Sequence, residues 1–98
     1  MFQLIFHEEA DREYAEAFLW YELQKTELRD EFRLAVSNCL KKLLKNPQFF
    51  GFNRKPYREI SVNSFPYTIV FDIDVSGNAV YISAIYHTAR DKKVQKIK

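Results

Sequence analysis

The chain has 98 residues, a formal net charge of +2, and a composition that is 47% hydrophobic and 16% aromatic. This length suits one small domain over residues 1–98; the apolar content excludes a disordered chain, and the small net charge does not by itself indicate a nucleic-acid partner. The single cysteine, Cys39, excludes an internal disulfide, and without a secretory leader or a long apolar run we expect a cytoplasmic protein with no membrane contact.

The first half of the chain predicts a strand followed by two helices. Residues 2–6 are short and apolar, which indicates a strand. From about His7 to Leu23 apolar residues recur at helical spacing, and acidic residues in the first turn suit the positive end of the helix dipole. A second helix begins with Thr26 as the expected N-cap and ends at Asn46-Pro47, because proline disfavours a helical residue before it. The short link predicts an antiparallel hairpin.

The second half predicts a loop and three strands. Residues 48–56 lack a clear period and indicate a loop rich in phenylalanine, whereas alternating patterns predict strands over 57–62, 65–73 and 79–87. In the last strand the alternation places Val80, Ile82, Ala84 and Tyr86 on one face and Tyr81, Ser83, Ile85 and His87 on the other. The order β-α-α-β-β-β predicts an α+β fold, with an antiparallel helical hairpin packed on one face of a mainly antiparallel four-stranded sheet.

A few residues are candidates for RNA chemistry, and among them His87 is the acid–base residue on the predicted open face of the sheet. Cleavage of RNA through its 2′-hydroxyl needs a proton acceptor, a proton donor and cations that stabilise the phosphate. His87 is the candidate acid–base residue and Glu59 a second possible base, and three arginines could bind phosphate: Arg54, Arg58 and Arg90. The alternative is structural, because a histidine at a strand end is commonly a packed or surface group and Arg90-Asp91 could form a local ion pair.

Other features indicate protein binding more than cofactor chemistry. Two distant histidines and one cysteine do not make a metal site, and glycine-rich phosphate loops are absent, so we expect neither metal nor cofactor. Leu19, Trp20 and the aromatic segment 49–52 lie off the main apolar stripes, and such a surplus in a small domain indicates a binding surface. The basic tail over residues 92–98 could contact nucleic acid or be simply solvated.

The order of these elements in so short a chain resembles the RelE/ParE superfamily of bacterial type II toxin–antitoxin toxins. The first helix of that superfamily resembles Glu8-Glu9-Ala10 with Tyr14 and Trp20-Tyr21, and the loop after its second helix resembles Asn46-Pro47 followed by an aromatic. Its ParE-like members have paired strands similar to Arg58-x-Ile60-x-Val62 and Phe65-Pro66-Tyr67-x-Ile69-x-Phe71. Their closing strand is similar to Ala84-Ile85-Tyr86-His87-x-x-Arg90-Asp91.

The resemblance implies a growth-inhibiting toxin that forms a hetero-oligomer with a cognate antitoxin. In the ParE-like branch the implied host target is DNA gyrase. In the RelE-like branch it is mRNA on the ribosome, which an endonuclease with His87, Arg90 and Arg58 as candidate catalytic residues would cleave. A member that has lost its toxicity is the third interpretation.

Departures from the family pattern favour the ParE-like branch. Thr68 stands where the ribonuclease branch commonly carries an arginine, and few basic residues fall on the predicted open face. After Asp91 the chain continues with Lys92-Lys93-Val94, where the family often has a proline, an aromatic residue and an arginine. We therefore expect inhibition of a host protein without intrinsic RNA cleavage.

Overall fold

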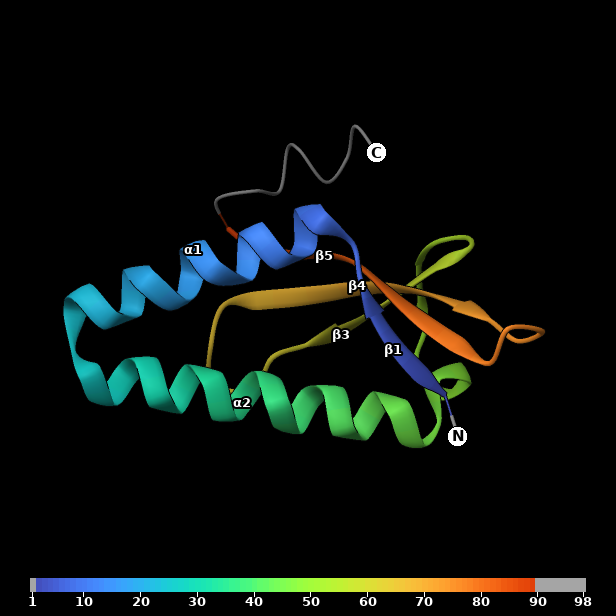
Figure 1. Cartoon of the computed structure of the whole chain (residues 1–98), viewed down its shortest axis with the longest axis horizontal. Coiled ribbons are helices and arrows are strands. Elements are labelled where there is room, and N and C mark those ends of the chain that lie inside the picture. The colour runs from blue at the N-terminus through green and yellow to red at the C-terminus, as the bar shows by residue number, and fades with distance from the viewer. Residues whose placement is uncertain (1, 90–98) are drawn as a thin grey trace.

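The structure is a computed structural model that describes residues 2–89 (Figure 1). In chain order its elements are β1 (Gln3–Phe6), α1 (Glu8–Gln24), α2 (Thr26–Lys45), the 3-10 turn η1 (Pro47–Phe49), β2 (Phe52–Arg54), β3 (Tyr57–Ser61), β4 (Tyr67–Asp74) and β5 (Ala79–His87). The predicted helices and four strands are confirmed. The prediction of a plain loop over 48–56 is wrong, because η1 extends into this segment and the short strand β2 lies within it.

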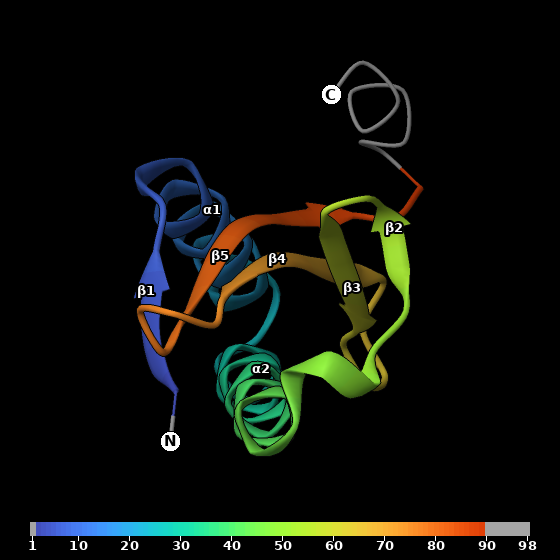
Figure 2. The ribbon, with the colours of Figure 1, turned by 90° about the vertical axis from the view of Figure 1, so that its right-hand side faces the viewer.

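Within residues 2–89 the sheet therefore has five strands, in the order β1-β5-β4-β3-β2 (Figure 2). Strand β1 runs parallel to β5, and the other neighbours are antiparallel, so the sheet is mainly antiparallel as predicted. Strand β2 was missed because it spans three residues and pairs with β3 through an irregular register. A strand this short carries too little alternation to be recognised from sequence.

The helical hairpin packs on one face of the sheet, also as predicted. Residue Lys25 alone links the two helices and is the N-cap of α2, one residue before the Thr26 that we expected. The aromatic ring of Phe32 on α2 lies 5.0 Å from Tyr21 on α1 and 5.3 Å from Tyr67 on β4, measured between ring centroids. These contacts fix the angle of the hairpin against the sheet.

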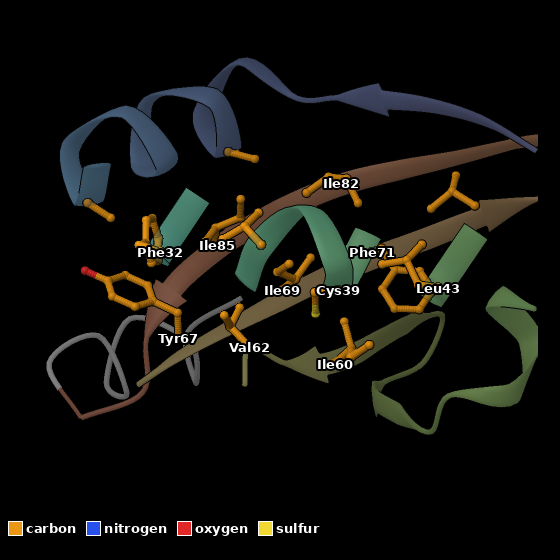
Figure 3. Close-up of a cluster of buried hydrophobic side chains, with 14 of the residues drawn as sticks. Phe32, Cys39, Leu43, Ile60, Val62, Tyr67, Ile69, Phe71, Ile82 and Ile85 are labelled. Atoms are coloured by element: carbon orange, nitrogen blue, oxygen red, sulfur yellow. The ribbon is translucent and has the colours of Figure 1, made fainter. Parts of the chain in front are cut away.

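One continuous apolar core lies between the hairpin and the sheet (Figure 3). Its most deeply buried side chains are Phe32, Leu43, Ile69, Phe71, Val80, Ile82 and Ile85. Burial of one such side chain stabilises the fold by roughly 1.5–3 kcal/mol. Within residues 2–89 no helix is both long and apolar enough to span a membrane.

A bulge in β5 determines which residues face the helices. Val70 pairs with Ala84 and the next residue of β4, Phe71, pairs with Ile82, so Ser83 has no partner in the ladder. Such an extra residue reverses the alternation after it. The prediction of a single alternation along 79–87 is therefore wrong beyond Ser83.

Helix α1 covers the edge of β5 that β1 leaves bare. Strand β1 ends at Phe6, opposite Ile82, so no strand among residues 2–89 pairs with the later residues of β5 on that side. The Ile85 N–H instead donates to Oε1 of Glu13 at 2.7 Å. A side chain on the helix thus replaces a strand partner and anchors α1 against the sheet.

Candidate functional site

His87 lies on the side of the sheet that faces the helices. It pairs across the ladder with Tyr67, a core residue, and the two ring centroids are 5.2 Å apart in an edge-to-face arrangement. Its Nδ1 accepts a hydrogen bond from the Ala89 N–H at 3.3 Å. The prediction that His87 lies on the open face is wrong, because the bulge at Ser83 reverses the alternation of side chains along the rest of β5.

Arg58 is engaged with the segment that joins α2 to β2. Its Nη1 donates to the carbonyl oxygens of Phe50 at 2.6 Å and Gln48 at 3.3 Å. Its guanidinium carbon lies 4.0 Å from the centroid of the Phe52 ring, close enough for a cation–π contact. These contacts hold the aromatic segment against the sheet. They engage the Arg58 guanidinium, the group that was predicted to bind phosphate.

Two of the three predicted catalytic residues, His87 and Arg58, do not converge on one point. Arg58 lies opposite Phe71 and His87 opposite Tyr67, and these two partners are four residues apart on β4. At about 3.3 Å per residue they are separated by roughly 13 Å along the strand, with two strand spacings of about 4.8 Å across the sheet in addition. A single phosphate cannot bridge that span. Arg90 and the basic tail lie outside the described residues.

The open face carries a small cluster that the sequence did not reveal. Thr68 and Tyr86 are paired across β4 and β5, and Thr68 is buried at 5% exposure. Burial, reinforced by the nearby Glu59 carboxylate, raises the pKa of the Tyr86 phenol, while a hydrogen bond to Thr68 opposes the rise. Thr68, at the position for which the family resemblance implied an arginine in the ribonuclease branch, is therefore next to a phenol that has the Glu59 carboxylate near it. The adjacent apolar pair Ala84-Ile85, which breaks strict alternation, was the signal that could have placed Tyr86 here.

Among residues 2–89, Arg54 and Lys55 place cations beside the open face at its β2 edge. A hollow of about 420 Å³ opens there, with Val70 and Ala84 in its floor and Arg54, Lys55 and Tyr57 around it. The Lys55 ammonium sits 5.2 Å from the ring centroid of Phe52. Residues 2–89 hold no group of three or more His, Cys, Asp or Glu side chains placed to bind a metal ion.

Exposed apolar side chains gather on the last turns of α1. Leu19, Trp20 and Leu23 are 54%, 49% and 74% exposed, and we call these three residues the α1 patch. The Trp20 indole stands edge-on to Tyr21 with 5.1 Å between centroids, which orients the ring at the surface. The predicted exposure of Leu19 and Trp20 is confirmed, and Leu23 was missed.

The aromatic segment after α2 is only partly exposed. Phe49 is 76% exposed, whereas Phe50 packs against the core with its ring centroid 6.2 Å from that of Phe71. The predicted surplus of surface aromatics therefore holds for Phe49 and Phe52 but not for Phe50. Apolar groups at the surface of a small domain suit protein–protein contact.

A family model described as the ParE toxin of the type II toxin–antitoxin system parDE matches residues 4–92. The chain belongs to the ParE toxin family. It is a type II toxin, in agreement with the resemblance drawn from its sequence. No curated protein sequence matches it.

Solved structures of related toxins share the fold. The chromosomal ParDE system from P. aeruginosa matches with a TM-score of 0.75 and 14% identity, over 89% of this chain and 96% of that one. The intact E. coli RelBE toxin–antitoxin complex matches with a TM-score of 0.64 and 18% identity, over 92% of this chain and 100% of that one. The isolated E. coli RelE toxin matches with the same TM-score and identity, over 100% of both chains.

Proposed function

We propose that this ParE-family toxin acts in the cytoplasm by binding and inhibiting a host protein, with DNA gyrase as its target, and that a cognate antitoxin neutralises it. The observation that carries this proposal is the separation of His87 from Arg58, two of the residues that a ribonuclease was expected to use. His87 faces the helices and Arg58 binds backbone carbonyls. Thr68 stands at the position for which the family resemblance implies an arginine in the ribonuclease branch. Loss of one group that stabilises transition-state charge typically slows a reaction about a hundredfold or more.

The surfaces that remain suit contact with another protein. The α1 patch offers two leucines and an oriented tryptophan, and tryptophan is enriched among residues that dominate binding energy. We propose that this patch takes part in binding the host target. The antitoxin partner is supported by related folds solved as toxin–antitoxin systems, including the ParDE system and the RelBE complex.

The deciding experiment induces the toxin and measures two outcomes in parallel. Messenger-RNA ends are mapped in cells, and supercoiling by purified gyrase is assayed with the purified toxin. We expect blocked supercoiling with intact mRNA. New RNA ends at ribosome-positioned codons that vanish in His87→Ala and Arg90→Ala variants would instead establish an endonuclease, and no response in either assay would indicate a member without toxicity.

A matched pair of variants tests the α1 patch. Leu23→Lys changes the most exposed residue of the patch, and Val75→Lys, in the β4–β5 turn, makes the same change at a similarly exposed site of 64%. Both should leave the free energy of unfolding within about 0.5 kcal/mol of wild type. We expect Leu23→Lys alone to relieve growth inhibition. Equal inhibition by both variants would remove the patch from the target interface.

A further inference from the structure

Strand β3 has a bare edge where β2 stops. Strand β2 pairs with Tyr57 and Arg58, and the Gly51 carbonyl accepts the Glu59 N–H at 3.1 Å. Beyond that point no strand among residues 2–89 covers this side of β3. Because main-chain groups alternate in direction along a strand, the N–H and C=O of Ser61 point the same way as those of Glu59, away from β4.

The two main-chain groups of Ser61 differ in what they contact. The carbonyl accepts a hydrogen bond from the Cys39 thiol of α2, with a sulfur–oxygen distance of 3.5 Å. No residue between 2 and 89 accepts a hydrogen bond from the Ser61 N–H. Ser61 is exposed, so this donor is available to an acceptor from outside the chain.

A groove runs beside this edge, between β3 and α2. It has a volume of about 630 Å³, and its apolar wall includes Ala35, Cys39, Ile60 and Val62. Figure 3 shows Cys39 directed between Ile60 and Val62, so the wall is continuous from helix to strand. Alternate side chains of an extended segment laid along the edge would point into this groove.

The ends of the groove carry opposite charges. Glu31 and Lys42 both border it, eleven residues apart on α2. At 1.5 Å per residue they are separated by roughly 16 Å, which is the span of about five extended residues. The groove is thus long enough for a short strand, and it favours a segment with a basic residue toward Glu31 and an acidic residue toward Lys42.

We propose that this edge and groove bind an extended segment of the antitoxin as an added strand. The proposal rests on the proposed function, which supplies an antitoxin. A backbone carbonyl of the segment accepts the Ser61 N–H, and apolar side chains at alternate positions fill the groove. Strand addition obtains affinity from main-chain hydrogen bonds and specificity from such alternating pockets. A recess of this length beside α2 suits a single extended chain better than the edge of a second folded copy.

The test uses purified toxin and the antitoxin encoded beside its gene. Ser61→Pro removes the outward donor but leaves the β3–β4 ladder intact, since proline is tolerated at an edge position whose N–H faces outward. Ser61→Ala keeps the donor and is the matched control. By titration calorimetry we expect Ser61→Pro to bind about tenfold more weakly or worse, and Ser61→Ala to stay within about twofold of wild type. Equal affinity of both variants would overturn the proposal.

Amide hydrogen exchange of the wild-type chain keeps the test decisive should Ser61→Pro not fold. The Ser61 amide should exchange at least about tenfold more slowly in the antitoxin complex than in the free toxin. Unchanged exchange would overturn the proposal, and slowing that depends on toxin concentration alone would assign the edge to a second copy. Antitoxin binding that weakens in Ser61→Pro, in a toxin that inhibits nothing, would support this site while refuting the proposed target.

Discussion

Arg58 is the residue for which the structural and catalytic interpretations predict opposite experimental results. If its role is to hold the segment after α2, Arg58→Ala loses the hydrogen bond to Phe50, the longer one to Gln48 and the contact with the Phe52 ring. A hydrogen bond from a charged group contributes about 1.5–3 kcal/mol, and we take the lower end because the side chain is only partly buried. With a cation–π contact of about 0.5–1 kcal/mol, we expect a loss of about 2 kcal/mol.

Urea unfolding followed by circular dichroism measures this loss. For a domain of this size, 2 kcal/mol lowers the midpoint by about 1–2 M urea and the melting temperature by roughly 8–15 °C. Arg58→Lys keeps the charge but not the planar fork, so its stability should fall between Ala and wild type. Growth inhibition should persist below the melting temperature of each variant. A variant that keeps wild-type stability but loses all toxicity would refute the structural role.

Four further perturbations have defined outcomes. Glu13→Ala should cost about 1–2 kcal/mol and speed exchange of the Ile85 amide, whereas Glu13→Gln, which keeps an acceptor, should cost less. Gly77→Ala should destabilise the β4–β5 turn by about 1 kcal/mol, because a Cβ at this position would collide with the Asp74 carboxylate. Hydrogen bonds from the Gly77 N–H and the Ser76 hydroxyl lower the pKa of that carboxylate. Because that pKa is lowered, the contribution of Asp74 is present above its unfolded pKa and should fade as pH falls, a loss that an Asp74→Asn variant should not show. Burial raises the pKa of the Cys39 thiol to about 11, so the folded state keeps a proton that the unfolded chain releases above about pH 8.5. Wild type should therefore lose about 2 kcal/mol relative to Cys39→Ala between pH 8.5 and 11, measured by urea unfolding at each pH; parallel profiles would contradict the assignment.

The elements that sequence analysis predicted are those with long, regular apolar patterns. The two helices and β4 each carry several apolar residues in one phase, and all of them occur at the expected positions. The predictions that failed concern where one helix begins and one short strand. The link between helices shifted the N-cap by one residue to Lys25, and β2 was too short to show a pattern. Neither error moved the core, because the core depends on which residues are apolar and not on where an element begins.

The error at β5 was different in kind, because it changed the functional interpretation. One unpaired residue, Ser83, moves every later side chain of the strand to the opposite face. It carries His87 away from the open face and brings Tyr86 onto it, beside Glu59 and Thr68. The face that each side chain occupies depends on how β5 pairs with β4. The periodicity of the β5 sequence alone does not reveal that pairing. A ribonuclease hypothesis built on His87 therefore required a flat, regular strand, and a ParE-like toxin that acts by protein contact does not.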